Sequence, residues 1–147
     1  MKKIIVLSLL LIAGFSSCKK DNNSTTDNSI TASNVASTVS AGTWRITLFN
    51  DSGTDETNHF TGYNFSFASG NVVTAVNGAT TVTGTWSTSS SSSGVDMLIA
   101  FGSPADFIEL TDDWDVVERT NTKIRLQSIS GGGGGTGTPN LFGTLNS

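Results

Sequence analysis

The stretch Gly42-Thr43-Trp44-Arg45-Ile46-Thr47-Leu48-Phe49 carries the pattern on which the fold depends. The polar residues Arg45 and Thr47 alternate with apolar ones, and a period of two is typical of a strand with one buried face. The first three residues recur as Gly84-Thr85-Trp86. Two tryptophans that enter strands in the same local setting predict a β domain with a core built around them.

Alternation of this kind continues along the chain and predicts further short strands. Turn signals separate them, and Asn77-Gly78 is the strongest hairpin signal. A helix is expected to begin at Ser103 and Pro104, with Ser103 as its N-cap, and to end near Leu110. The further strands are expected at about residues 59–68, 72–76, 80–87, 95–101, 113–119, 123–129 and 140–146.

These elements predict an all-β fold, in agreement with a chain of 147 residues that has 16 glycines and many serines and threonines. Consecutive strands usually pair with one another, so the eight strands predict an antiparallel up-and-down meander. Closure of the meander into a small barrel, or folding into a sandwich, would protect its edges. One short helix is expected between the fifth and sixth strands.

Residues 1–17 have the pattern of a secretory signal peptide. A basic start, Met1-Lys2-Lys3, precedes an apolar run at residues 4–12 that is too short for a membrane-spanning helix. The only cysteine, Cys18, follows mostly small residues, and this arrangement resembles the lipobox of bacterial lipoproteins, in the relaxed form found in Bacteroidetes. The resemblance implies cleavage before Cys18, lipidation of that residue, and anchoring in the outer membrane, at the periplasmic face or the cell surface. An ordinary signal peptide with an incidental cysteine is the alternative.

Residues 18–40 are expected to form a lipid-anchored tether that leads into a β domain at residues 41–147. The first half of the tether is polar and has no periodicity, which predicts disorder. Its lysines resemble a surface-export signal of Bacteroidetes lipoproteins, and a plain spacer is the equal alternative. Apolar residues at positions 30–41 recur with roughly helical spacing, so a short helix capped by Thr31 or Ser33 is expected.

Composition and charge exclude several classes of function. Removal of Lys2 and Lys3 with the signal leaves six basic residues against 12 acidic ones, a net charge of −6. That balance argues against a nucleic-acid partner, which needs a basic surface. One cysteine and one histidine exclude an intrachain disulfide, a cysteine zinc site and a catalytic Cys–His pair. No nucleophile–base arrangement is visible, so we expect no enzymatic activity, catalytic residue, cofactor or metal site.

Two groups of polar residues could bind a cation, although a solvated surface is the interpretation that we favour for both. Carboxylates around the sixth strand could bind Ca²⁺ through oxygen, but the spacing of an EF-hand is absent. A loop before the second strand could hold a cation or a general base. The first group is Asp106, Glu109, Asp112, Asp113 and Asp115, and the second is Asp51, Asp55, Glu56 and His59.

The strand pattern as a whole resembles a known family. Gly42-x-Trp44 opens the first strand, Phe60-x-Gly62-Tyr63-x-Phe65-x-Phe67 follows, and Gly84-Thr85-Trp86 and residues 122–126 extend the pattern. Together these motifs are similar to those of the lipocalin-like, calycin-type lipoproteins of Bacteroidetes. The resemblance implies a lipocalin-like small barrel, in which the tryptophan closes one end beneath a basic residue of a late strand. Arg125 is the best match for that basic residue.

An eight-stranded barrel is just wide enough to be filled by side chains or to hold one small ligand. We favour a packed core or a shallow cleft, because many large aromatic residues are expected to point inward. They are Trp44, Tyr63, Phe65, Phe67, Trp86, Phe101 and Trp114. For a bound ligand, the expected contact residues are Trp44, Tyr63, Phe65, Trp86, Trp114 and Arg125.

These observations predict a lipid-anchored, non-enzymatic outer-membrane β-barrel domain. It would act as a binding or accessory module for a small apolar ligand or a partner protein. The alternative is a structural or adhesive surface protein with a solidly packed barrel and no small-molecule ligand. The expected partners are the membrane, through lipidated Cys18, and a small hydrophobic ligand or a surface protein, but no nucleic acid.

Overall fold

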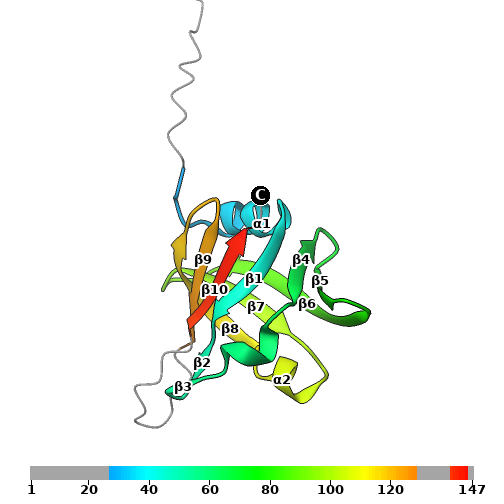
Figure 1. The fold of residues 1–147 in the computed structure, drawn as a ribbon. Helices are drawn as coiled ribbons and strands as arrows, with labels where there is room; N and C mark the ends of the chain where they lie inside the picture. Colours follow the sequence, from blue (N-terminus) through cyan, green and yellow to red (C-terminus); the bar gives the residue numbers. More distant parts are fainter. Residues whose placement is uncertain (1–26, 129–139, 146–147) are drawn as a thin grey trace, which may run out of the picture.

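The structure is a computed structural model that describes residues 27–128 and 140–145. Eight strands form a closed antiparallel barrel and follow one another around it in chain order (Figure 1). The predicted signal peptide and Cys18 lie outside the described residues. The barrel strands are β1 (Thr43–Leu48), β4 (Asn64–Ala68), β5 (Val72–Asn77), β6 (Thr80–Ser90), β7 (Val95–Ala100), β8 (Asp112–Arg119), β9 (Lys123–Gln127) and β10 (Asn140–Leu145).

Strand β1 closes the barrel, because it pairs with β10 on one side and with β4 on the other. The pairing with β4 is short and joins only Thr43 to Ser66 and Trp44 to Phe65. The prediction of an all-β, eight-stranded up-and-down barrel is therefore confirmed, and the barrel rather than the sandwich is the form that it takes. The expected helix between the fifth and sixth barrel strands is α2 (Ala105–Ile108).

The inner faces of the strands follow the predicted alternation. In β1 the indole of Trp44 is buried, whereas Arg45 and Thr47 are exposed. In β7 the side chains of Met97 and Ile99 are buried and that of Leu98 is exposed. The barrel interior is therefore one hydrophobic core, to which all the barrel strands with described side chains contribute.

The second barrel strand begins later than the alternation predicts. It was expected from His59, but His59 and Phe60 lie in a 3-10 turn, η1 (Thr57–Phe60), and β4 starts at Asn64. Gly62 lies between them with a φ of +87°, a left-handed conformation that breaks an extended strand and favours glycine. The preceding loop contains a small hairpin of β2 (Asn50–Asp51) and β3 (Thr54–Asp55).

The predicted helix before the barrel is present as α1 (Ala32–Ser40). Thr31 is its N-cap, as expected, and its hydroxyl accepts a hydrogen bond of 3.1 Å from the backbone N–H of Asn34. The helix lies across one end of the barrel (Figure 1), where Val35 and Val39 are buried in the core. The folded unit therefore includes α1 and begins earlier than residue 41, because the helix covers apolar surface that the strands leave open.

Arg119, at the end of β8, fastens α1 to the barrel. The residue is only 9% exposed, and its guanidinium donates hydrogen bonds to the hydroxyl of Thr38 (2.8 Å) and the carbonyl oxygen of Asn34 (3.1 Å). It also donates to the carbonyl oxygens of Asp27 (2.6 Å) and Ser29 (3.0 Å). The segment before α1 is thus held at the same end of the barrel as the helix.

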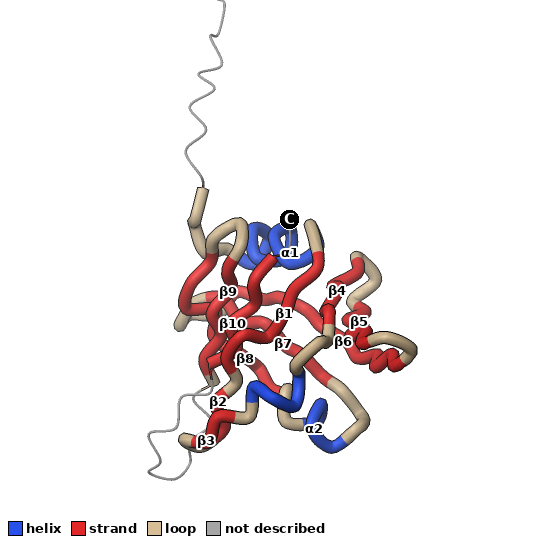
Figure 2. Tube along the Cα trace, viewed as in Figure 1, coloured by secondary structure: helices blue, strands red, loops and turns tan. Residues whose placement is uncertain are grey.

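The opposite end of the barrel carries η1 and α2, which Figure 2 shows as the helical segments away from α1. Pro104, rather than the predicted Ser103, occupies the N-cap position of α2, and no side chain caps the helix. Phe107 and Leu110, three residues apart, are each 1% exposed, so both face the core. Among residues 27–128 and 140–145, no helix is long and apolar enough to cross a membrane.

Candidate functional site

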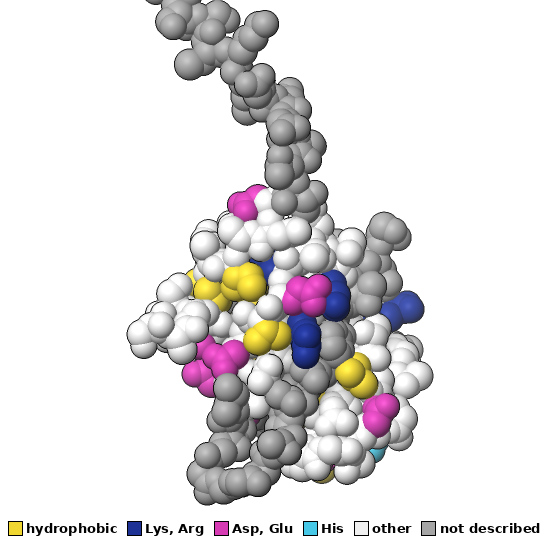
Figure 3. All heavy atoms as spheres, turned by 90° about the vertical axis from the view of Figure 1, so that its left-hand side faces the viewer, with side chains coloured by type: hydrophobic (Ala, Val, Ile, Leu, Met, Phe, Trp, Pro, Cys, Tyr) yellow, Lys and Arg dark blue, Asp and Glu magenta, His cyan; other side chains and the backbone are white. Residues whose placement is uncertain are grey.

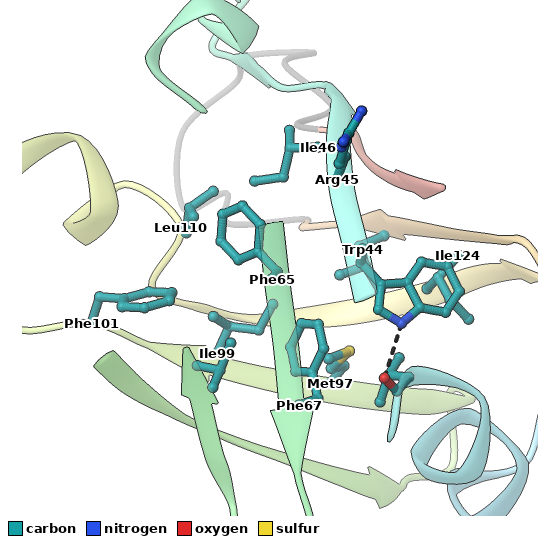
Figure 4. Close-up of a pocket in the computed structure, with 13 residues that line it drawn as sticks. Trp44, Arg45, Ile46, Phe65, Phe67, Met97, Ile99, Phe101, Leu110 and Ile124 are labelled. Carbon is teal, nitrogen blue, oxygen red and sulfur yellow. Dashed lines mark hydrogen bonds between the residues drawn. The ribbon is translucent and has the colours of Figure 1, made fainter. Parts of the chain in front are cut away.

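The three tryptophans are structural members of the barrel, since each indole N–H is bound to the backbone. Trp44 donates to the carbonyl oxygen of Val39 at 2.9 Å, which joins β1 to α1 (Figure 4). Trp86 donates to the carbonyl oxygen of Ala68 at 3.0 Å. Trp114 donates to the carbonyl oxygen of Leu110 at 3.0 Å. Their polar groups are therefore satisfied within the protein, as buried indoles require.

Phe107 of α2 is the centre of an aromatic cluster that fills the end of the barrel opposite α1. Its ring lies 5.0 Å from that of Tyr63 and 5.1 Å from that of Phe101, measured between ring centres. The rings of Phe60 and Phe65 lie at 5.5 and 6.0 Å. These spacings are those of ordinary aromatic packing, so this end of the barrel is closed by side chains.

Among the described residues, a small, partly open cavity with a volume of about 30 Å³ lies in the barrel. Figure 4 shows Ile46, Phe65 and Leu110 side by side at the cavity, whereas Arg45 points away from it. A single water molecule needs roughly 10–15 Å³ by this kind of measure. The lining residues are Val39, Trp44, Arg45, Ile46, Phe65, Phe67, Val73, Met97, Ile99, Phe101, Leu110, Ile124 and Leu126.

Ligand-binding pockets usually have volumes of roughly 300–1,000 Å³. The cavity in this barrel is about ten times smaller than the lower end of that range. Its lining is apolar except for Arg45, whose Nε–H donates outside the cavity to the side-chain oxygen of Asn64 at 3.1 Å. The cavity therefore has room for about two molecules of the size of water, but not for a lipid or a haem.

Of the six residues expected to contact a ligand, the structure brings only Trp44 and Phe65 together at the cavity. Tyr63 is half-buried and packs against Phe107. Trp86 and Trp114 are buried elsewhere in the core.

Arg125, the sixth of these residues, is half-buried and lies on the face of β9 opposite to the buried Ile124 and Leu126. The arginine that reaches the α1 end of the barrel is instead Arg119.

Several lining residues of the cavity were not among the expected contacts. Met97 and Ile99 of β7 belong to an alternating strand, so their inward direction could be read from the sequence. Val39 of α1 and Leu110 after α2 reach the cavity because their helical segments pack over the ends of the barrel. That packing has no local signal in the sequence.

An open hollow of about 430 Å³ lies between α1, the turn that joins β4 to β5, and β6. Trp86 is at its base, and most other lining residues are small and polar, such as Ser37, Ser69 and Asn71. The amide of Asn71 is bound to the carbonyl oxygen of Trp86 at 2.9 Å. The hollow is therefore open to solvent, and more of its exposed lining is apolar than polar.

Residues of both acidic groups that the sequence predicted as possible cation ligands interact with other side chains of the protein. Asp112 accepts a hydrogen bond from the hydroxyl of Ser128. Burial raises the pKa of Asp115 above its ordinary value, and repulsion from Asp96, directly opposite on β7, raises it further. In the other group, hydrogen bonds from the side chain and backbone of Thr57 lower the pKa of Asp55.

Comparison of the chain with models of known protein families, with curated proteins and with solved structures finds no match.

Proposed function

We propose that the chain is a lipid-anchored, non-enzymatic outer-membrane module whose barrel is a packed scaffold and which acts through its surface, as a structural or adhesive protein. The observation that carries this proposal is the interior cavity of about 30 Å³. A module of this kind needs a stable barrel and exposed loops, and both are present. The resemblance of the strand motifs to lipocalin-like lipoproteins of Bacteroidetes supports a lipid-anchored barrel protein of that kind.

The proposed anchor is Cys18, because it follows a lipobox-like stretch at the end of a signal peptide. Several acyl chains on one cysteine would hold the protein stably, whereas one chain gives only marginal binding. The described chain starts at the α1 end of the barrel (Figure 1). An anchor that precedes residue 27 would therefore hold the α1 end towards the membrane and leave η1, α2 and the β2–β3 hairpin facing away from it.

The surface is suited to specific polar contacts more than to burial of a large apolar patch. On the face in Figure 3, exposed apolar side chains lie in small groups that polar and charged side chains separate. An ion pair between Lys123 and Glu118, at 2.8 Å, lies on the strands β8 and β9. Scattered exposed apolar residues are normal for a protein surface. Those among the described residues are Ile30, Val72, Val76, Leu98, Ile108 and Val117.

Replacement of Cys18 by alanine in the full-length chain tests the anchor. In a Bacteroidetes host, the wild-type protein should take up a labelled fatty acid and sediment with the outer membrane. The Cys18→Ala protein should lose the label and leave the membrane fraction, whereas Ser24→Ala, a change in the same polar segment, should behave as wild type. An unlabelled wild-type protein, or a Cys18→Ala protein that stays in the membrane fraction, would contradict the proposal.

A second candidate function is the binding of one small apolar molecule inside the barrel. The observation in its favour is that the cavity lies at the short pairing of β1 with β4, where two residue pairs hold the strands together. Separation of β1 from β4 beyond Trp44 would widen the cavity beside Ile46 and Phe65. This candidate requires a change of shape, whereas a packed scaffold requires none.

A further inference from the structure

Three side chains that can bind a metal ion meet at the end of the barrel opposite α1. Glu56 directly precedes η1, His59 lies within η1, and Glu109 directly follows α2. The fold brings these two segments together, although they lie far apart in the sequence (Figure 1). One ligand atom from each residue lies within 4.8 Å of the ligand atoms of the other two.

The spacing of these atoms fits metal ligands better than hydrogen-bond partners. Nδ1 of His59 lies 3.7 Å from Oε2 of Glu109, which is too long for a hydrogen bond. Two donor atoms that each lie about 2.1 Å from one tetrahedral Zn²⁺ are separated by roughly 3.4 Å. To bind one Zn²⁺, the two atoms of this pair would have to approach one another by only about 0.3 Å. Two ligand atoms at the 4.8 Å limit would have to approach by about 1.4 Å.

Two polar atoms of the cluster are buried and have no hydrogen-bond partner among the described residues. They are Oε2 of Glu56 and Nδ1 of His59. A buried polar atom without a partner is costly and rare in folded proteins. Both residues belong to the three whose ligand atoms lie within 4.8 Å of one another, so a cation bound among them would give these polar groups a partner.

The charges of the cluster also favour a cation. Glu56 and Glu109 place two carboxylates within reach of one bound ion. Two carboxylates held this close repel one another when both are ionised. The side chains of His59 and Glu109 remain 31% and 35% exposed, so an ion can reach the cluster from solvent.

The backbone beneath the cluster is fixed by packing. The ring of Phe60, next to His59, lies 5.3 Å from that of Phe49 and 5.5 Å from that of Phe107. The hydroxyl of Thr57, next to Glu56, accepts a hydrogen bond of 2.8 Å from the backbone N–H of Phe49. Ligands that the core holds in place need little ordering when a metal ion binds.

We propose that Glu56, His59 and Glu109 form a binding site for a divalent transition-metal ion. One imidazole nitrogen and two carboxylate oxygens are ligands that suit Zn²⁺, whereas Ca²⁺ takes six to eight oxygens. Three protein ligands leave a coordination position for water or a further ligand. The ion would join the segment before β4 to the segment before β8 and so brace the end of the barrel that faces away from α1.

Isothermal titration calorimetry with ZnCl₂ tests this site on residues 19–147, which include every described residue. The protein must carry no histidine tag and must be freed of metal beforehand. We expect one Zn²⁺ per chain, with an affinity that falls by about tenfold or more, or about 1.4 kcal/mol, in His59→Gln and in Glu109→Gln. Asp51→Asn, a change at an exposed acidic residue of the neighbouring loop, is the matched control and should bind as wild type.

Two further measurements keep the result interpretable. Zn²⁺ should raise the thermal unfolding midpoint of the wild type and of Asp51→Asn, but not that of His59→Gln, because only binding to the folded state stabilises it. A large excess of Ca²⁺ should not displace Zn²⁺. The proposal is overturned by the absence of Zn²⁺ binding to the folded wild type, by equal affinity in folded His59→Gln and Glu109→Gln, or by displacement with Ca²⁺.

Discussion

Replacement of Gly84 by alanine probes how closely the strands of the barrel pack. Gly84 lies on β6 between the buried Val82 and Trp86. A Cβ atom added there would lie 2.6 Å from Cδ1 and 2.9 Å from Cε1 of Phe101, and closer still to the carbonyl oxygen of Ala100. Real Cβ contacts almost never fall below 3.0 Å. The ring and the end of β7 would both have to move, and a strand backbone moves less easily than a flexible side chain.

The expected magnitude follows from two opposing effects. Overpacking of a well-packed core costs about 1–3 kcal/mol. Replacement of glycine also lowers the conformational entropy of the unfolded chain. Where the native backbone accepts alanine, this effect stabilises the folded protein by about 0.4–1 kcal/mol. Gly84 does not have a positive φ, so this second effect applies there. The two ranges together leave a decrease of about 0–2.6 kcal/mol in the free energy of unfolding, and because one of the close contacts is with the backbone we expect at least about 1 kcal/mol.

Urea unfolding of residues 19–147, followed by circular dichroism, measures this change. Gly102→Ala is the matched control, because a Cβ atom at Gly102 meets nothing within 4 Å and its φ is not positive. It should leave the free energy of unfolding unchanged or raise it by up to about 1 kcal/mol. If Gly84→Ala is as stable as the wild type while Gly102→Ala behaves as expected, the close approach of Phe101 and Ala100 to Gly84 is refuted.

Three further changes test the contacts of the barrel. Trp44→Phe leaves the carbonyl oxygen of Val39 without its indole partner and should cost about 1–3 kcal/mol in urea unfolding; a cost near zero would contradict a structural role for that hydrogen bond. Arg119→Leu should speed hydrogen exchange of the α1 amides more than that of the β5 amides, because the helix loses its charged anchor; equal acceleration of both would argue against it. Asp96→Asn removes a like charge opposite Asp115 and should stabilise the protein by about 0.2–1 kcal/mol at neutral pH. The raised pKa of Asp115 means that stability falls as pH rises through that pKa, so the gain should vanish in acid, where the carboxyl is protonated; a gain that persists in acid would show another cause.

Local patterns account for most of the barrel. In β1 the alternation predicted the buried Trp44 and the exposed Arg45 and Thr47, but not the buried Phe49, which follows a register shift between Ile46 and Leu48. The beginning of β4 was predicted too early: Phe60 is out of phase with Tyr63, Phe65 and Phe67, and it lies in η1. Phe60 is buried by Phe49 and Phe107, which are distant in sequence.

The clusters at the two ends of the barrel depend on contacts between distant residues. Helical spacing predicted α1, but not that Arg119, 81 residues after Thr38, would hold it against the barrel. Glu56 and Glu109 were each visible as acidic residues in separate groups, and only the packing of η1 against α2 places them together. Periodicity in the sequence shows which face of a single helix or strand is buried. It does not show which residues of different elements come into contact.

Native mass spectrometry of residues 19–147, after incubation with lipid extracts, fatty acids and haem-like compounds, tests the packed barrel most directly. The cavity of about 30 Å³ predicts the mass of the polypeptide with no bound organic molecule, before and after incubation. The same spectra should be recorded after denaturation. A reproducible added mass of several hundred daltons that disappears on denaturation would contradict the packed scaffold and would favour the second candidate, a barrel that opens to admit a ligand.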